Sequence, residues 1–423
     1  MRNATLWRAL LGVEKTVIES IEFDEDAGEL IACVRPRRPG RGRCGECGRR
    51  ASWYDRGEGR RRWRSLDLGT IPVWLEADAP RVNCPEHGPT VRAVPWARHG
   101  AGHTRAFDEQ VAWLATQCSK TAVVELMRIA WRTVGAIITR VWADVEAVHD
   151  RFAGLRRLGI DEISYKRGHR YLTVVVDHDS GRLVWAAPGR DKATLEAFFD
   201  ALEASGEGRC AAITHVSADG ADWISDVVAG RCVNAVRCAD PFHIVRWATD
   251  ALDEVRRQAW NEARGAVHQR RAGRATGHAK ALKHARYALW KNPENLTTRQ
   301  QAKLAWVAKA DPRLHRAYLL KEGLRLVFQL GYQDAIDALE AWIGWARRCR
   351  IPAFVALQTR IVKHKASILA AIEHGLSNGR IESVNTKIRL ITRVAFGFRS
   401  PEALIALAML NLGGHKPALP GRS

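Results

Sequence analysis

The order of apolar segments constrains the fold of this 423-residue chain more than any other feature. From Leu158 to Asp240, five apolar runs of strand length alternate with two helical patterns in the order β-β-β-α-β-α-β. The runs lie in RLGIDEIS, YLTVVVDH, RLVWAAP, AAITHVSAD and CVNAVRCAD, and the helices in DKATLEAFFDALEAS and GADWISDVVAG. A hairpin meander that leads into parallel strands predicts a mixed α/β sheet.

The segments on either side of this sheet have other periodicities, and the length of the chain exceeds that of one domain. Residues 1–98 are predicted to form strands and loops, and residues 99–153 are predicted to form helices. The two segments that follow the sheet, 244–370 and 371–423, are predicted to be helical. The predicted domains are 1–98 (zinc-binding, arginine-rich), 99–153 (helix-turn-helix), 154–243 (mixed sheet), 244–370 (all helical) and 371–423 (C-terminal helices).

The charge of the chain points to a polyanionic partner. A net charge of +20 favours nucleic acid, with an anionic membrane surface as the second choice. No run of about 20 apolar residues predicts a membrane span, and the N-terminus lacks the pattern of a signal peptide. The nine cysteines are mostly scattered singly, which favours a reducing compartment such as the bacterial cytoplasm over a disulfide framework.

Two short motifs near the N-terminus carry metal-ligand residues. Cys44 and Cys47 form C-x-x-C, and Cys84 and His87 form C-x-x-H, each in a tight turn followed by glycine. Thiolates and imidazole suit Zn²⁺, and four filled positions predict a structural site. The gap between the pairs, residues 48–83, is longer than a usual finger loop, so reduced cysteines with a surface histidine are the alternative. A redox motif lacks the βαβ context it would need.

An arginine-rich stretch between Arg35 and Arg64 surrounds the first cysteine pair and includes Trp53, Tyr54 and Trp63. We expect its arginines to contact DNA phosphates and its aromatic residues to pack on the zinc module or on sugars. A solvated basic loop is the alternative. The residues predicted to bind DNA here are Arg60, Arg61, Arg62 and Arg64.

The segment SKTAVVELMRIAWRTVGAIITRVW has the length and pattern of a helix-turn-helix. Ser119 is predicted to cap the first helix, and RIAW is the turn. The residues expected to face the major groove are Arg132, Thr133, Ala136 and Arg140. An ordinary helical hairpin is the alternative, but the charge of the chain and the neighbouring zinc motif favour DNA binding.

Three acids are candidates for a catalytic metal site. Asp161 lies where the first strand ends, and Asp219 follows the fourth strand. If these strands are neighbours, both carboxylates meet at the edge of the sheet where ligands bind, and they repel unless a cation separates them. Mg²⁺ suits such carboxylates together with phosphate oxygens, and a pair of ions would hold the attacking and leaving oxygens. Glu382, on a late helix, would be the third acid.

The neighbours of these acids have expected roles too. Arg380 and Lys387 lie close to Glu382 in sequence and are expected to contact DNA, with Asn378 and Asn385 in supporting positions. Any single aspartate at a strand end could instead cap a turn. Glu162 is expected to point to the opposite face of the strand and could be mistaken for the ligand.

A competitor follows the fifth strand. Asp240 in CADPFHIVR could replace Asp219, and pattern alone does not decide between them. His243 could be a metal ligand, a proton shuttle or a cap, and we favour an orienting role near the site.

Four ordered blocks resemble the bacterial insertion-sequence transposases of the ISL-three family. They are GIDEISYKRGHRYLTVVVDHDSGRLVWAAPGRDKATLEAFF, VSADGADW, CADPFHIVRWATDALDEVRR and SNGRIESVNTKIRLITRVAFGFRS. The resemblance implies a ribonuclease-H-like DDE core in which Asp161, Asp219 and Glu382 are the acids, and it selects Asp219 over Asp240. Asp240 and His243 match the family's D-x-F-H block, to which we assign a supporting role.

The resemblance also implies an architecture and an activity. The helical stretch after Ile244 is an insertion in the core, and its tryptophans, among them Trp247, are expected to pack between helices or, in one case, to stack on a flipped base. The departures from the family pattern are Ala218, Gly220 and Ser383, and none removes a ligand.

The expected function is a DNA transposase that binds terminal inverted repeats, cleaves DNA with Mg²⁺ or Mn²⁺, and joins the ends to target DNA as a dimer or larger assembly. A DNA-binding regulator with an inactive core is the alternative.

Overall fold

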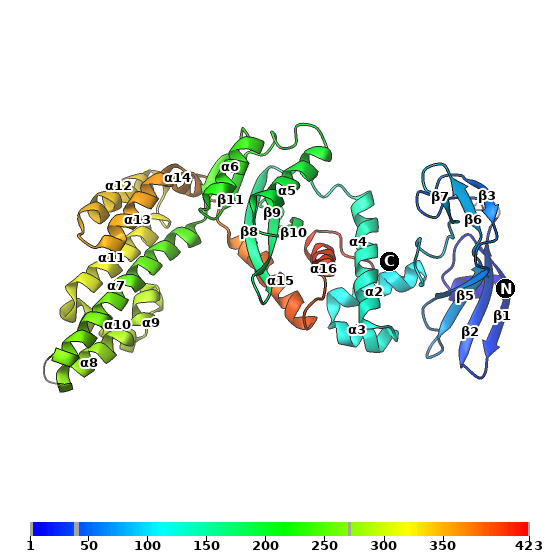
Figure 1. Cartoon of the computed structure of the whole chain (residues 1–423), viewed down its shortest axis with the longest axis horizontal. Coiled ribbons are helices and arrows are strands. Elements are labelled where there is room, and N and C mark those ends of the chain that lie inside the picture. The colour runs from blue at the N-terminus through cyan, green and yellow to red at the C-terminus, as the bar shows by residue number, and fades with distance from the viewer. Residues whose placement is uncertain (1–2, 38–41, 270–271, 422–423) are drawn as a thin grey trace. The chain divides into compact units, whose positions relative to one another are not determined.

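The computed structural model describes residues 3–37, 42–269 and 272–421 (Figure 1). The chain forms two compact units, one of Met1–His149 with Leu390–Ser423 and one of Asp150–Arg389. Within the described ranges no helix combines the length and the apolar character that a membrane span needs.

The N-terminal module consists of two small sheets and one helix that the sequence did not predict, α1 (Asn3–Leu10). Beneath the larger sheet, the rings of Trp63 and Trp96 pack edge to face with centroids 5.6 Å apart. The larger sheet has the order β1 (Thr16–Asp24), β2 (Glu29–Pro36), β5 (Val73–Asp78), β4 (Arg60–Arg64). The smaller has the order β3 (Ser52–Asp55), β6 (Arg81–Cys84), β7 (Gly88–Val91).

Four helices follow in the same unit: α2 (Arg105–Gln117), α3 (Lys120–Met127), α4 (Trp131–Val148) and, from the C-terminus, α16 (Pro401–Leu412). Ser119 caps α3 as expected, accepting a hydrogen bond from the backbone of Ala122, and Arg128 in the left-handed region ends it. The sequence of α16, PEALIALAMLNL, is apolar almost all round, because the helix is buried against α2 and α4.

This packing differs from the domain boundaries expected from sequence. We expected residues 371–423 to belong entirely to the sheet domain, but the structure groups Leu390–Ser423 with the N-terminal unit. Part of the reason is Phe398, whose ring covers the buried amino group of Lys120 at 4.8 Å. Such a contact lies between residues far apart in sequence, and no local pattern reveals it.

The second unit contains a five-stranded mixed sheet in the order β10-β9-β8-β11-β12. The first three strands along the chain are antiparallel, and β11 and β12 continue in parallel from β8. Helices α5 and α6 pack on the sheet over a core that includes Phe198 and Phe199. The bounds are β8 (Arg157–Lys166), β9 (Arg170–Asp177), β10 (Leu183–Pro188), α5 (Lys192–Ala204), β11 (His215–Ala218), α6 (Asp222–Arg231) and β12 (Val236–Ala239).

The predicted order of strands and helices is therefore confirmed, as is the mixed α/β class. The helical stretch that interrupts this core is also confirmed. It consists of α7 (Pro241–Gln269), α8 (Ala272–Lys283), α9 (Arg286–Trp290), a 3₁₀ turn (Pro293–Asn295), α10 (Thr298–Ala310), α11 (Pro312–Val327), α12 (Tyr332–Arg348), α13 (Pro352–Lys363) and α14 (Lys365–Glu373).

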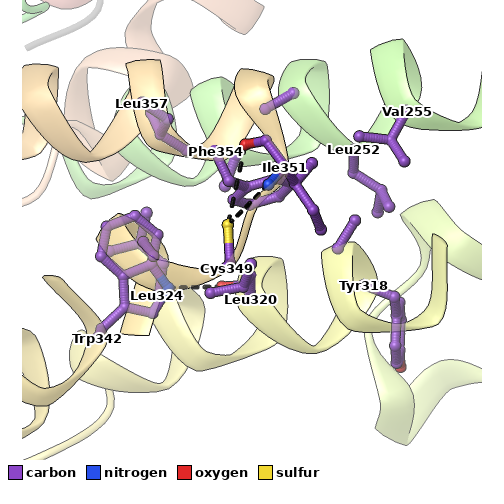
Figure 2. Close-up of a cluster of buried hydrophobic side chains, with 14 of the residues drawn as sticks. Leu252, Val255, Tyr318, Leu320, Leu324, Trp342, Cys349, Ile351, Phe354 and Leu357 are labelled. Atoms are coloured by element: carbon purple, nitrogen blue, oxygen red, sulfur yellow. Dashed lines mark hydrogen bonds between the residues drawn. The ribbon is translucent and has the colours of Figure 1, made fainter. Parts of the chain in front are cut away.

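The helical insertion has its own apolar core (Figure 2). Phe354 at its centre is fully buried, and the indole nitrogen of Trp342 donates a 2.7 Å hydrogen bond to the carbonyl of Leu320. This hydrogen bond pairs a polar group inside the apolar core, which is the condition for burying it at little cost.

Helix α15 (Gly379–Val394) brings the chain back to the sheet. Its Ile381 lies so close to β8 that a Cβ atom on Gly159 would stand 2.2 Å from the Cδ1 atom of Ile381. A glycine is therefore required two residues before Asp161 for the helix to approach the strand.

The substitution Phe354→Ala should destabilise the insertion by about 3–5 kcal/mol, because it removes a fully buried ring and leaves a cavity. Val355→Ala is the matched control, since Val355 is next in sequence and 36% exposed, and it should change stability by less than about 0.5 kcal/mol. Hydrogen exchange in peptides from α11 to α13 measures the difference. Equal protection in both variants would contradict the assignment of Phe354 to the core.

Candidate functional site

The four predicted zinc ligands lie together in the N-terminal module. The ligand atoms of Cys44, Cys47, Cys84 and His87 all lie within 4.8 Å of one another. The Sγ atoms of Cys47 and Cys84 are 3.7 Å apart, and Nδ1 of His87 is 3.6 Å from Sγ of Cys84. A tetrahedron with metal bonds of about 2.0–2.3 Å has edges of about 3.3–3.8 Å, so the cluster has the dimensions of a zinc site.

The local chain explains this geometry. Gly48 and Gly88 follow the two ligand pairs with φ of +70° and +66°, a conformation that glycine adopts without steric cost. The hydrogen bond with His87 lowers the pKa of Cys84 to about 6, so this thiol ionises readily. Since all four positions of a tetrahedron are occupied by protein, the cluster supports a structural zinc site with no position open for a substrate.

The arginines of β4 are more engaged with the protein than the sequence suggested. Arg60 and Arg62 both form ion pairs with Glu76, at 3.0 and 2.7 Å, although their side chains remain about half exposed. Arg61 donates to the carbonyl of Ala101 at 2.9 Å. These three side chains hold the module together as well as presenting charge to solvent.

Arg64 departs furthest from the expectation of a DNA contact. It is 6% exposed, and its guanidinium donates to the carbonyl of Ser65 at 2.7 Å and pairs with Asp67 at 2.5 Å. Two of the twelve arginines in this stretch, Arg38 and Arg41, lie outside the described residues.

The predicted helix-turn-helix corresponds to α3 and α4. Val134, Ile137 and Ile138 of α4 are fully buried, as predicted from their spacing. On the outer face of α4, Arg132 and Ala136 are exposed and Thr133 is half-buried. The surface available for DNA is therefore centred on the first turns of this helix.

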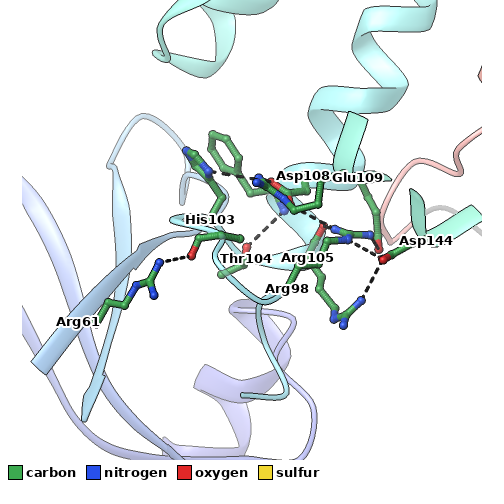
Figure 3. Close-up of polar contacts among 11 residues, drawn as sticks. Arg61, Arg98, His103, Thr104, Arg105, Asp108, Glu109 and Asp144 are labelled. Atoms are coloured by element: carbon green, nitrogen blue, oxygen red, sulfur yellow. Dashed lines mark hydrogen bonds and ion pairs between the residues drawn. The ribbon is translucent and has the colours of Figure 1, made fainter. Parts of the chain in front are cut away.

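Arg140, the fourth residue expected to face DNA, is instead held by a buried carboxylate. Its Nε and Nη2 atoms donate to the two oxygens of Asp108 at 2.9 and 3.0 Å, and Asp108 is fully buried. Arg98, 7% exposed, reaches the same carboxylate at 3.3 Å and Asp144 at 2.6 Å (Figure 3). This network joins α2, α4 and the preceding loop, so Arg140 serves the fold of the domain.

Three aspartates lie at one level across neighbouring parallel strands of the mixed sheet. Strand β11 pairs in parallel with β8 on one side and with β12 on the other. Strand β11 pairs with β8 up to Ser217 and Gly159, and with β12 up to Ala218 and Ala239. If both pairings are extended to Asp219, this residue lies opposite Asp161 on one side and opposite Asp240 on the other. The carboxyl ends of parallel strands form the edge at which ligands bind in such sheets. The structure therefore brings both predicted aspartates and their competitor to this acidic edge. Asp161 does not end its strand as predicted, because β8 continues to Lys166 through its pairing with β9; only the parallel pairing with β11 stops before it.

The charges of these acids act on one another. Burial raises the pKa of Asp161, and the neighbouring charges of Asp219 and Asp240 also raise it. His243 counters them: its Nδ1 atom lies 2.6 Å from Oδ2 of Asp240, and this hydrogen bond raises the pKa of the imidazole, as do the charges of Asp161 and Asp219.

Glu162, the residue that could be mistaken for a ligand, is half-buried beside the edge. Burial raises its pKa to about 7, and the charges of Asp219 and Asp161 act in the same direction. Near neutral pH this carboxyl is therefore only partly ionised.

The N-terminal turns of α15 are fixed to the acidic edge by side-chain hydrogen bonds. The amide nitrogen of Asn385 donates to Oδ2 of Asp161 at 2.7 Å. Oδ1 of Asn378 accepts at 2.5 Å from Ser217, which is in turn 2.6 Å from Nε2 of His178. The two asparagines are 5% and 2% exposed, so they position the helix and do not face solvent.

No local sequence pattern predicts this chain of hydrogen bonds. His178 and Ser217 lie on β-strand ends that become neighbours only in the sheet, and burial lowers the pKa of His178 to about 4, so its ring is neutral. Arg380, expected to contact DNA, donates instead to the backbone carbonyls of His178 and Asp179. Lys387, by contrast, is exposed as expected.

Glu382 lies on the same helix as Asn385. It is exposed in the first turn of α15, three residues before Asn385, and its carboxylate makes no hydrogen bond or ion pair with any residue that the structure describes. It is the only acidic residue in α15.

The acidic edge has the donor set that a divalent cation requires. Half-buried like charges need a counter-charge, and carboxylate and amide oxygens are ligands that Mg²⁺ accepts. Oδ1 of Asn385 is buried beside Asp161 and has no hydrogen-bond partner among the described residues. Unlike the zinc ligands, the acids are not drawn together to within 4.8 Å, so the edge is an open group of neighbouring acids.

Comparison with known proteins gives matches over nearly the whole chain. A family model described as a transposase of the ISL3 group matches residues 158–408. The helix-turn-helix domain of transposase family ISL3 matches residues 92–142, and the zinc-finger of the transposases IS204, IS1001, IS1096 and IS1165 matches residues 40–87.

Individual relatives agree with these matches. The transposase for insertion sequence element IS1557 of Mycobacterium tuberculosis is 68% identical, over 100% of this chain and 98% of the relative. The transposase for IS1001 of Bordetella parapertussis is 27% identical, over 95% and 96%. Among solved structures, the Drosophila P element transposase strand transfer complex has a TM-score of 0.36 and 9% identity, covering 74% of this chain and 92% of that one, a likeness too weak to support an inference.

The zinc site predicts that Cys84→Ser abolishes metal retention, because one of four ligands is lost. Elemental analysis of the purified chain should give one zinc per wild-type chain and almost none for the variant. Cys118→Ser is the control and should retain zinc, since Cys118 lies at the end of α2 away from the cluster. Wild-type protein without zinc would contradict the assignment.

The network around Asp108 predicts that Arg140→Gln lowers stability by about 1–3 kcal/mol, since a buried carboxylate loses one of its two arginine partners. Arg132→Gln, on the exposed face of α4, should change stability by less than about 0.5 kcal/mol but should weaken DNA binding. Urea unfolding and DNA affinity separate the two effects. Unchanged stability in Arg140→Gln would show that the network does not support the domain.

Proposed function

This chain belongs to the ISL3 family of insertion-sequence transposases, and we propose that it cleaves DNA at the ends of its element and joins them to target DNA at the acidic edge. The observation that supports the proposal is the alignment of Asp161 in β8 with Asp219 and Asp240, which directly follow the carboxyl ends of β11 and β12. We infer that Asp161 and Asp219 are cation ligands and that Glu382 is the third catalytic acid.

The remaining residues of the edge would position these acids. Asn385 orients Asp161 through its 2.7 Å hydrogen bond and fixes the helix that carries Glu382. Asp240 is 3% exposed, and its carboxylate is hydrogen-bonded to His243. This pair would therefore orient the neighbouring acids and partly balance the negative charge of the acidic edge. A divalent cation bound there, Mg²⁺ or Mn²⁺, would stabilise charge on the scissile phosphate and favour ionisation of the attacking water or 3′-hydroxyl.

We infer that the zinc module and the helix-turn-helix bind the terminal inverted repeats. Exposed Arg132 and half-buried Thr133 on α4 support this role, as do the half-exposed Arg60 and Arg62 and the exposed Lys387. Because two element ends must be held together for joining, we expect a dimer or larger assembly on DNA. A partner of this kind would place the protein on the nucleoid in the bacterial cytoplasm.

The proposal predicts that Asp161→Asn and Asp219→Asn each reduce Mg²⁺-dependent nicking of terminal-repeat DNA by about 1,000-fold or more, because several kcal/mol of charge stabilisation is lost. Labelled DNA measures both nicking and affinity, and the affinity should be retained. Asp226→Asn, an exposed acid on α6, is the matched control and should nick normally.

Two further variants separate the remaining acids. Glu382→Gln should abolish nicking, whereas Asp240→Asn should reduce it less. The reverse result would make Asp240 the third acid in place of Glu382. Wild-type protein that binds terminal-repeat DNA but never nicks it would favour the alternative function, a DNA-binding regulator.

A further inference from the structure

An arginine without a carboxylate partner stands near the acidic edge. Arg360 lies on α13 and is exposed, and no carboxylate among the described residues lies within ion-pair distance of its guanidinium. The acid that could have paired with it, Asp222, is taken by Lys363, whose Nζ atom is 2.8 Å from both of its oxygens. Arg360 therefore carries a free positive charge.

The plane of this guanidinium is fixed by an indole ring. The Cζ atom of Arg360 lies 3.4 Å from the ring centroid of Trp247, which is stacking distance. The indole also packs against the core of the helical insertion. One face of Trp247 is thus covered by Arg360. On this face the indole is not free to stack on a flipped base, a role that the sequence left open for one of these tryptophans.

The indole in turn packs against the loop of a catalytic acid. A Cβ atom on Gly220 would lie 2.5 Å from Cζ2 and 2.6 Å from Cη2 of Trp247. Only glycine therefore fits after Asp219, which explains why a small residue stands where the family pattern suggested a bulkier one. The contact ties the position of Arg360 to the loop that carries Asp219.

Two observations place Arg360 close enough to the acidic edge to be influenced by its negative charge. Trp247 follows His243 by four residues on α7, and residues with this spacing lie on the same side of a helix. Desolvation lowers the pKa of Arg360, and the charge of Asp219 is the largest electrostatic influence opposing it. The guanidinium is therefore held near the acidic edge without an ion pair to any carboxylate that the structure describes.

We propose that Arg360 binds a backbone phosphate of the DNA strand close to the phosphodiester that is cleaved at the acidic edge. This inference rests on the function proposed above. The planar guanidinium matches two phosphate oxygens at once, and its stacking on Trp247 reduces the conformational freedom lost on binding. Arg360 would act as a positioning residue that sets the register of the strand against Asp219.

The test compares Arg360→Gln with Arg347→Gln in the full-length protein. Arg347 is an exposed arginine on α12 with no carboxylate partner in the part of the chain that the structure describes, so its loss changes the net charge equally. Without added Mg²⁺ or Mn²⁺, where no cleavage occurs and the structural zinc is retained, the slope of log Kd for terminal-repeat DNA against log salt should fall by about 0.9 in Arg360→Gln, as for one lost phosphate contact, and should not change in Arg347→Gln.

Neutral methylphosphonate groups identify the phosphate. Placed singly along the strand near the cleavage site, one of them should weaken binding of wild-type protein about tenfold and leave the affinity of Arg360→Gln unchanged. With Mg²⁺, nicking by Arg360→Gln at saturating DNA should fall about 10–100-fold, and Arg360→Lys should keep the salt slope but recover only part of the rate, because lysine lacks the planar fork.

The inference is overturned if Arg360→Gln and Arg347→Gln have the same salt slope and the same response to every methylphosphonate. If Arg360 only stabilises the fold through its stacking on Trp247, Arg360→Gln should lower the melting temperature and leave the salt slope of DNA binding unchanged. That result would also contradict the proposed phosphate contact. These binding measurements need no cleavage, so they stand even if wild-type protein fails to nick DNA and the proposed function is wrong.

Discussion

The parallel register of β8, β11 and β12 is the constraint on which the rest of the site depends. It sets three aspartates side by side, and burial, together with the charges of Asp219 and Asp240, raises the pKa of Asp161. The protein offsets this cost in part with His243 and with the amide of Asn385. We propose that a divalent cation supplies the missing positive charge and in turn binds the phosphate of the substrate.

Helix α15 follows the helical insertion in sequence and packs against the same sheet. Gly159 leaves room for Ile381, and Asn378 is held by Ser217 and His178. The helix therefore meets the sheet through one close apolar contact and several buried hydrogen bonds, whose loss would leave unsatisfied polar groups. Since Glu382 shares this helix, the same contacts determine where its carboxylate is presented.

The charge of +20 does not translate into an equal number of DNA contacts. Arg64, Arg98 and Arg140 are tied to buried or half-buried carboxylates and carbonyls, and they stabilise the N-terminal unit. Arg132 and Arg360 differ, because they are exposed and have no acid beside them. The net charge therefore overstates the number of arginines whose charge is free to attract a polyanion.

The sequence by itself determined the order of strands and helices, the four zinc ligands and the position of Asp219 directly after a strand, because periodicity and ligand spacing are local properties of the chain. It placed Asp161 at a strand end, whereas β8 continues to Lys166. It also supplied the family through its motif blocks. Only the tertiary structure decided that Asp240 joins Asp161 and Asp219, that α16 packs with α4, and that Arg140 pairs with Asp108. Each of these is a contact between residues distant along the chain, and strand register and burial, which create such contacts, have no signature in any short segment.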